Sequence, residues 1–170
     1  MIYEKALRIA WMAKQAGVLF LVNDHTDIAA AVDADGVHLG QDDLPIGHAR
    51  SVLGREKIIG LSTHSPEQAA AAQAEGADYI GFGPLFRTAT KDAGQAQGIQ
   101  GLTSLRNEIL IPILAIGGIN HENVKRVIQA GADGVAVISA ILSSRDRKDA
   151  TREMIRRIGE AVSDGEGETR

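Results

Sequence analysis

Short apolar runs recur at regular intervals along the whole chain. Each run is four or five residues long, rich in β-branched residues and almost continuously apolar. Strands of a parallel sheet, which are covered on both faces, have this pattern, whereas half-exposed antiparallel strands alternate apolar and polar positions. The runs predict buried parallel strands at residues 18–22, 36–39, 57–61, 78–82, 112–116 and 134–138.

The alanine-rich stretches between these runs carry the signals of helix ends. Ser65 and Pro66 are typical of an N-cap and a first helical residue, and Gln68 stands where a capping box places its amide. This helix is predicted to end at Glu75, because Gly76 adopts a left-handed C-cap without strain. Similar signals predict helices at residues 1–16, 124–129 and about 148–162.

Strands and helices therefore alternate throughout, and an alanine–aspartate pair opens three of the strands, at residues 34–35, 77–78 and 132–133. This alternation predicts right-handed βαβ units, and hence an open doubly wound sheet or a (β/α) barrel. A complete eight-stranded barrel usually needs about 250 residues. A chain of 170 residues with six strands is either an open sheet or a barrel that lacks two strands. We expect one domain over residues 1–162 and a polar, frayed tail at 163–170.

Composition narrows the class of protein. A net charge of −4 argues against a nucleic-acid partner, and the absence of cysteine excludes a disulfide scaffold and thiolate metal sites. No apolar run approaches the roughly 20 residues that a membrane helix needs. The first residues mix charge into their apolar positions, unlike a secretory signal. We expect a soluble, cytoplasmic protein that binds neither nucleic acid nor membrane.

Polar residues and glycines follow each predicted strand. In parallel α/β proteins, ligands bind at the carboxyl ends of the strands. Helix caps require Asn, Asp, Ser and Gly at the same places, and capping explains part of the pattern. It does not explain the cluster of Thr88, Thr90 and Lys91 in the longest loop. These strand ends are the predicted binding site, and of the five histidines only His64 is expected near it.

The last two strand–helix junctions contain Gly117 and Gly118, and Ile138 and Ser139. In barrels, this pair of junctions commonly binds a phosphate group through backbone N–H groups and a helix N-terminus. Glycine leaves those amides accessible to the anion, because it has no side chain. The sequence therefore favours a phosphate site here.

Asp24 and Asp43 follow two neighbouring strands and are candidate ligands of a hard cation. Magnesium commonly takes one or two carboxylates and fills its other positions with water and phosphate oxygens. Helix capping without any metal accounts for the same two residues. Lys91 either neutralises a second anionic group or is an ordinary solvated lysine.

Six motifs, taken in order, resemble the thiamine-phosphate synthase family. They are VND at 22–24, HLGQDD at 38–43, GLSTH at 60–64, GPLFRTATK at 83–91, IGGI at 116–119 and VISAI at 137–141. The resemblance implies a TIM-barrel-type (β/α) fold. It also implies an enzyme that joins a pyrimidine diphosphate to a thiazole phosphate and releases pyrophosphate, with Mg²⁺ bound.

Carried over by position, the resemblance implies a role for each site residue. Asp24 and Asp43 would hold the magnesium, and Asn23, Ser62 and Lys91 would contact the pyrimidine diphosphate, with Ser62 and Lys91 also catalytic. The residues implied in binding the thiazole phosphate are Thr88, Ala89, Thr90, Gly118, Ile138 and Ser139.

The chain departs from the family in two respects, of which the smaller is Arg87, where relatives usually carry proline. The Gln-x-Arg-x-Lys segment that grips the diphosphate in the family does not occur, and the resemblance implies that the first two barrel strands and the first helix are missing. We expect the strand at 18–22 to be an apolar sheet edge, and a homodimer to cover the open side of the barrel. Two alternative functions stay open: a non-catalytic or tautomerase-like binder of thiazole or thiamine phosphate, and a sugar-phosphate isomerase.

Overall fold

A computed structural model describes residues 1–87 and 95–167 of the chain. Its six strands, all parallel, are β1 (Leu21–Asn23), β2 (Gly36–Leu39), β3 (Ile58–Thr63), β4 (Tyr79–Phe82), β5 (Ile113–Ile116) and β6 (Gly134–Ala136). The helices that alternate with them are α1 (Ile2–Ala16), α2 (Thr26–Ala31), α3 (Ile46–Leu53), α4 (Pro66–Ala74), α5 (Gly98–Arg106), α6 (Val124–Gln129), α7 (Ser139–Leu142) and α8 (Arg147–Gly167). The alternation predicted from the apolar runs is confirmed.

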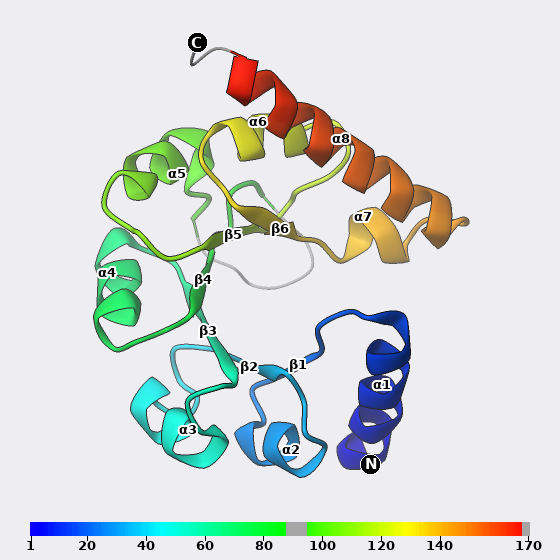
Figure 1. Ribbon diagram of the computed structural model, residues 1–170. Coiled ribbons are helices and arrows are strands. Elements are labelled where there is room, and N and C mark those ends of the chain that lie inside the picture. Colours follow the sequence, from blue (N-terminus) through cyan, green and yellow to red (C-terminus); the bar gives the residue numbers. More distant parts are fainter. Residues whose placement is uncertain (88–94, 168–170) are drawn as a thin grey trace.

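The sheet is curved and open. Its strands are ordered β1 to β6, each paired with its neighbours along the chain, and β1 and β6 are its two edges. The strands follow an arc with helices along its outside, while α1 and α7 flank its open side (Figure 1). The expected TIM-barrel-type fold, incomplete at six strands, is confirmed.

The hydrophobic core lies between the outer face of the sheet and the helices. Most side chains that point outward from the four central strands are almost completely buried: Val37, Leu39, Ile59, Ile80, Phe82, Ile113 and Ala115. The inner face differs, because its side chains are only half-buried and several are polar. Packing on the outer face therefore supplies most of the apolar burial that stabilises the described fold.

The alanine–aspartate pairs have a structural role that joins neighbouring strands. The carboxylate of each aspartate accepts a hydrogen bond of 2.7–2.8 Å from the N–H of a residue near the start of the preceding strand. The N–H of the aspartate donates in return to the carbonyl of that same residue. The three clamps are Asp35 with Phe20, Asp78 with Ile59, and Asp133 with Ile113.

Two element boundaries differ from the expected ones by three or more residues. The first strand begins at Leu21 rather than at residue 18, because Leu21 pairs with Gly36 at the start of β2 and nothing described pairs with Val18 or Leu19. Helix α8 continues to Gly167, beyond the expected end at 162, so the residues expected to form a frayed tail are helical as far as they are described.

Ion pairs hold α8 and give it its polar character. Glu160 lies 2.6 Å from Lys125 of α6, and Glu153 pairs with Arg156 and Arg157 on α8 itself. Hydrogen bonds from those two arginines lower the pKa of Glu153 to about 2. Among the described residues, no helix is both long and apolar enough to cross a membrane.

The clamp at Asp78 is expected to contribute measurably to stability. Its carboxylate accepts from the N–H of Ile59 at 2.7 Å and from Arg50 at 2.6 Å, so Asp78→Ala deprives both donors of a partner. We expect the free energy of unfolding in urea to fall by about 1–3 kcal/mol. Asp164→Ala, at an exposed position on α8, is the control and should change it little. Equal stability of the two variants would show that the clamp is not stabilising.

Candidate active site

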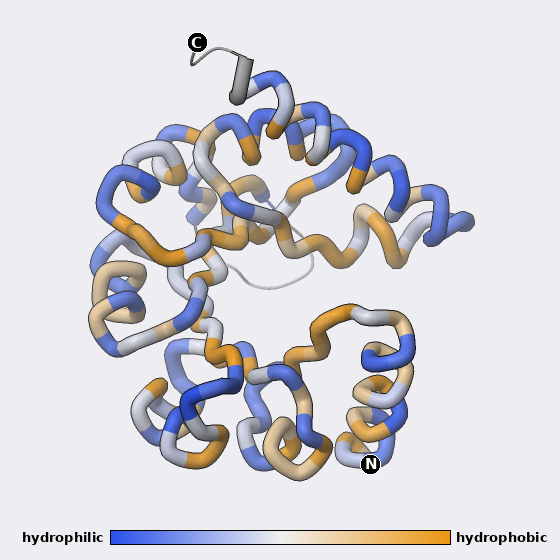
Figure 2. The backbone as a smooth tube through the Cα atoms, in the orientation of Figure 1, coloured by the Kyte–Doolittle hydropathy of each residue, from blue (hydrophilic) through white to orange (hydrophobic). Residues whose placement is uncertain are grey.

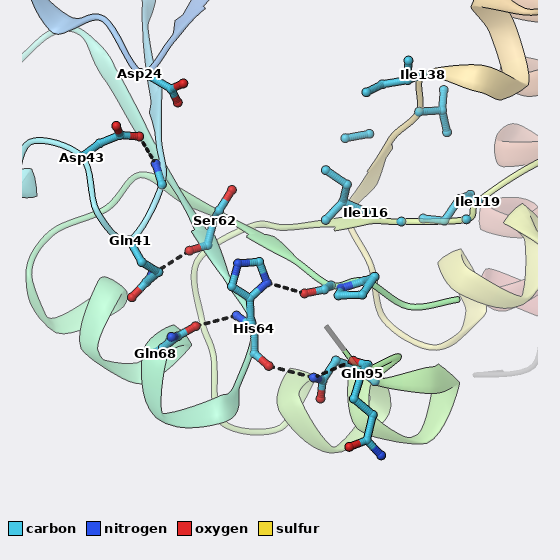
Figure 3. Close-up of a pocket in the computed structure, with 18 of the residues that line it drawn as sticks. Asp24, Gln41, Asp43, Ser62, His64, Gln68, Gln95, Ile116, Ile119 and Ile138 are labelled. Carbon is cyan, nitrogen blue, oxygen red and sulfur yellow. Dashed lines mark hydrogen bonds between the residues drawn. The ribbon is translucent and has the colours of Figure 1, made fainter. Parts of the chain in front are cut away.

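The carboxyl ends of the strands surround one cavity of about 760 Å³. Residues that follow or end each of the six strands contribute to its wall, although they are far apart in the sequence. Eight residues singled out from the sequence line it together, five of them labelled in Figure 3: Asp24, Asp43, Ser62, His64 and Ile138, with Gly117, Gly118 and Ser139. The predicted convergence of the strand ends into one pocket is therefore present in the described part of the chain.

One side of the cavity is acidic. Asp24 follows β1 and has a left-handed backbone, with φ of 65°, while its N–H donates to the carbonyl of His38 at 2.8 Å. Asp43 lies in the turn after β2, where its Oδ2 accepts from the N–H of Gly40 at 2.7 Å. A left-handed conformation is unusual outside glycine and often marks a functional position. The backbone thus holds both carboxylates at the same end of the cavity.

The opposite side consists of backbone groups and small apolar side chains. Gly117 and Gly118 have φ of 92° and 66°. A Cβ atom on Gly118 would lie 2.8 Å from the carbonyl oxygen of Arg87, so packing against the loop after β4 already requires glycine there. The N–H of Gly118 donates to no residue that the structure describes. Ser139 begins α7, and N–H groups in the first turn of a helix have no acceptor within it.

The end of β3 forms the floor between these two sides. Here the side chain of Gln41 donates to the carbonyl of Ser62 at 2.7 Å, and the ring Nδ1 of His64 lies 2.7 Å from the carbonyl oxygen of Gly83. Gln68 accepts from the N–H of His64 at 2.7 Å, rather than from Ser65 as a capping box requires. Gln97 donates to the carbonyl of His64 at 2.8 Å (Figure 3).

Sequence reasoning did not single out these glutamines as site residues. Gln41 lies within the motif that also contains Asp43, so its position in the sequence was a usable signal. The sequence indicates only a helix cap at Gln68, and its amide accepts from the residue before the one that a capping box requires. Gln95 and Gln97 also line the cavity, but nothing in the sequence near them marks a site.

The other predicted site residues are not placed in the cavity wall. Asn23 ends β1 next to Asp24 and does not line the cavity among the described residues. Thr88, Ala89, Thr90 and Lys91 lie outside the described residues.

The acidic side fits a magnesium ion but not a metal held by the protein alone. Within residues 1–87 and 95–167, no cluster of three or more His, Cys, Asp or Glu side chains could hold a metal ion. Asp24 and Asp43 supply two carboxylates to one cavity. That number suits Mg²⁺, which is often bound by one or two carboxylates together with water and phosphate oxygens.

The fold and the site together define a protein of the (β/α)-barrel type with a polar ligand cavity at the carboxyl ends of its strands. A family model described as thiamine monophosphate synthase matches residues 1–141. The chain belongs to this family.

Individual relatives agree with the family match. The chain is 53% identical over 153 residues to a thiamine-phosphate synthase of Syntrophomonas wolfei, covering 89% of this chain and 73% of the relative. It is 45% identical over 152 residues to the Clostridium acetobutylicum protein of the same name, covering 89% and 72%. A solved structure of thiamine phosphate pyrophosphorylase from Pyrococcus furiosus superposes with a TM-score of 0.87 at 40% identity, covering 94% of this chain and 76% of that one.

The left-handed backbone at Asp24 generates a stability prediction. Glycine adopts this conformation without the steric cost that alanine bears, which is about 1–2 kcal/mol. We therefore expect the free energy of unfolding in urea to be about 1 kcal/mol higher for Asp24→Gly than for Asp24→Ala. The control is Asp27 in α2, where glycine should be less stable than alanine by about 1 kcal/mol. The same order at both positions would contradict a strained backbone at Asp24.

Proposed function

We propose that this chain is a transferase of thiamine biosynthesis. It would condense 4-amino-2-methyl-5-pyrimidinylmethyl diphosphate with thiazole phosphate, giving thiamine phosphate and pyrophosphate. The observation that carries the proposal is one cavity with carboxylates on one side and backbone amides on the other, in a chain 53% identical to a protein named thiamine-phosphate synthase. A reaction between two phosphorylated molecules needs two anion sites within reach of each other, and this arrangement supplies them.

The pyrimidine diphosphate is assigned to the acidic side. Asp24 and Asp43 would hold Mg²⁺, which when bound offsets the negative charge of the diphosphate. Ser62 lies at the end of β3 on the same cavity and supplies a hydroxyl. Asn23 and Lys91 are assigned to the same substrate by position in the family motifs, and Lys91 would offset part of the charge of the leaving group.

The thiazole phosphate is assigned to the amide-rich side. The N–H of Gly118, which donates to no described residue, and the first turn of α7 at Ser139 suit a phosphate group, and Ile138 supplies an apolar wall beside them. Thr88, Ala89 and Thr90 complete this site in the proposal. The two phosphates then lie on opposite sides of one cavity, with their reactive ends between them.

The proposed reaction forms no covalent bond between substrate and protein. The bond between the pyrimidine methylene carbon and the diphosphate oxygen breaks, and its electron pair leaves with pyrophosphate. The lone pair of the thiazole nitrogen then forms the new carbon–nitrogen bond. No protein nucleophile takes part, so catalysis rests on holding the two substrates in line and on stabilising the departing charge.

A direct assay tests this function. The purified chain is incubated with both substrates and Mg²⁺, and thiamine phosphate is measured. We expect product, and we expect Asp43→Asn to lower kcat/KM by about 100-fold or more, because it removes a charge from the diphosphate side. Asp27→Asn, on the exposed surface of α2, is the control and should act like the unaltered chain.

Binding measurements separate the two remaining outcomes. Tight binding of thiazole phosphate without any product would overturn the transferase and favour the non-catalytic binder. Product formed equally well by Asp43→Asn would leave the transferase standing and remove Asp43 from the diphosphate site.

We further propose that the protein is a cytoplasmic homodimer whose partner covers the open side of the sheet. Exposed apolar side chains support this, because Val18 and Leu19 before β1 are 58% and 67% exposed, and Leu142 in α7 is 58% exposed. The segment between α1 and β1 and the helix α7 lie on the two flanks of the open side, and both contain stretches coloured hydrophobic (Figures 1 and 2). Strand edges flanked by apolar residues favour association with another chain.

The dimer is tested by light scattering over a range of protein concentrations. We expect Leu19→Asp to raise the dissociation constant of the dimer at least about 10-fold, because it places a charge on an apolar contact. Leu110→Asp, at an 87% exposed position between α5 and β5, is the matched control. A monomer at high concentration, or equal effects of the two substitutions, would contradict a partner at the open side.

A further inference from the structure

A row of three hydrogen-bonded side chains crosses the inner face of the sheet next to the cavity. The hydroxyl of Tyr79 lies 2.8 Å from Nδ1 of His38, and Nε2 of His38 lies 2.8 Å from Oγ of Ser62. The three residues belong to β4, β2 and β3 respectively. Of the three, Ser62 lines the cavity. A half-buried tyrosine is thereby connected to a hydroxyl at the candidate active site through one imidazole ring.

Two glycines on the same face make room for this row. Gly60 is the backbone neighbour of both His38 and Tyr79, and a Cβ atom on it would lie 2.1 Å from Cζ of the tyrosine ring. A Cβ atom on Gly81 would lie 3.2 Å from Cε1 of His38. The two rings therefore lie across β3 and stack, with centroids 5.5 Å apart and planes at 26°. The arrangement is specified by five positions on three strands and is not an incidental surface contact.

The direction of the hydrogen bonds follows from the tyrosine. Burial raises the pKa of Tyr79 to about 12, so its hydroxyl keeps its hydrogen near neutral pH. Among the described residues, that hydroxyl has no hydrogen-bond partner other than His38. A phenol hydrogen donated to Nδ1 selects the tautomer of the neutral ring that carries its own hydrogen on Nε2. Nε2 then donates to Oγ of Ser62 and occupies a lone pair of that oxygen.

We propose that Tyr79 and His38 are positioning residues that fix Ser62 as a hydrogen-bond donor toward the ligand. A serine hydroxyl has one hydrogen, and with His38 donating to its oxygen that hydrogen is left for the cavity. The group it meets is an acceptor without a hydrogen of its own, such as a diphosphate oxygen or an unprotonated ring nitrogen. This inference rests on the proposed function, which puts the pyrimidine diphosphate beside Ser62.

A double-mutant cycle tests whether Tyr79 acts through Ser62. Tyr79→Phe keeps the ring and removes the donor, and we expect kcat/KM for thiamine phosphate formation to fall about 3- to 10-fold, the worth of one hydrogen bond. In a Ser62→Ala background the same change should cost nothing further. Tyr3→Phe, at the other tyrosine of the chain on the exposed face of α1, is the control. Additive losses, or no loss in Tyr79→Phe, would overturn the proposal.

A conservative pair at His38 separates positioning from general damage to the fold. The amide nitrogen of glutamine reaches as far as ring Nε2, whereas that of asparagine does not. We expect His38→Gln to keep a larger part of kcat/KM than His38→Asn, although both remove the ring stacked on Tyr79. Equal losses with equal falls in unfolding free energy would mean that His38 only packs against its neighbours.

Calorimetry identifies the accepting group. Inorganic pyrophosphate and the pyrimidine alcohol are titrated separately into the unaltered chain and into Ser62→Ala. Weaker binding of pyrophosphate alone assigns the hydrogen bond to a diphosphate oxygen, and weaker binding of the alcohol alone assigns it to a ring nitrogen. Unchanged binding of both would overturn the role of Ser62 as a donor.

Nitrogen NMR of the histidine rings tests the row without any activity. The signals of His38 are identified by their loss in His38→Gln, and its neutral ring is expected to have an unprotonated Nδ1 and a protonated Nε2. A protonated Nδ1 in the neutral ring would overturn the proposed direction. If the chain forms no product but shows the expected ring, the transferase proposal fails while the arrangement of Tyr79, His38 and Ser62 stands.

Discussion

The fold depends on a two-point hydrogen-bonded clamp that is made by an aspartate and repeated three times. Asp35, Asp78 and Asp133 each fix the amino end of one strand to the start of the strand before it. Each carboxylate replaces the acceptor that a strand N–H lacks where the sheet ladder begins. All three clamps lie at the amino ends of the strands. The carboxyl ends are therefore free to carry polar residues that contribute to a site rather than to the sheet.

The two faces of the sheet also have different roles. The outer face carries the buried aliphatic and aromatic side chains, such as Leu39 and Phe82, and so carries the hydrophobic stabilisation. The inner face carries His38, Ser62 and Tyr79 with glycines between them. Because these inner positions are only half-buried and carry less of the apolar packing, they are able to hold polar groups.

The sequence predicted the features that arise from local pattern. Continuous apolar runs located all six strands, and the cap residues Ser65 and Gly76 located a helix end each. The residues after the strands, Asp24, Asp43 and Gly118 among them, were found because parallel topology gathers strand ends whatever the details of packing. The predicted start of β1 was wrong by three residues. An apolar run shows which residues are able to form a strand, but it does not show whether a neighbouring strand is present to pair with them.

Contacts across strands could not be predicted in this way. The sequence places only His64 near the site, whereas His38 contacts residues that are 24 and 41 positions away along the chain. The glycine pair at 117–118 was interpreted as room for an anion, and the structure adds a second cause, the close approach of the loop after β4. A glycine in the sequence therefore indicates that a side chain would not fit at that position. It does not indicate whether a ligand or another part of the chain lies there.

The acidic and amide-rich sides of the cavity come from opposite ends of the arc, β1–β2 and β5–β6. Their separation is set by the curvature of the strands between them, β3 and β4. Tyr79 on β4 lies over Gly60 of β3. It is connected to Ser62, also on β3, through His38 of β2. In the proposed function, the central part of the sheet both spaces the two anion sites and orients the hydroxyl between them, so a change in packing at Gly60 would act on both at once.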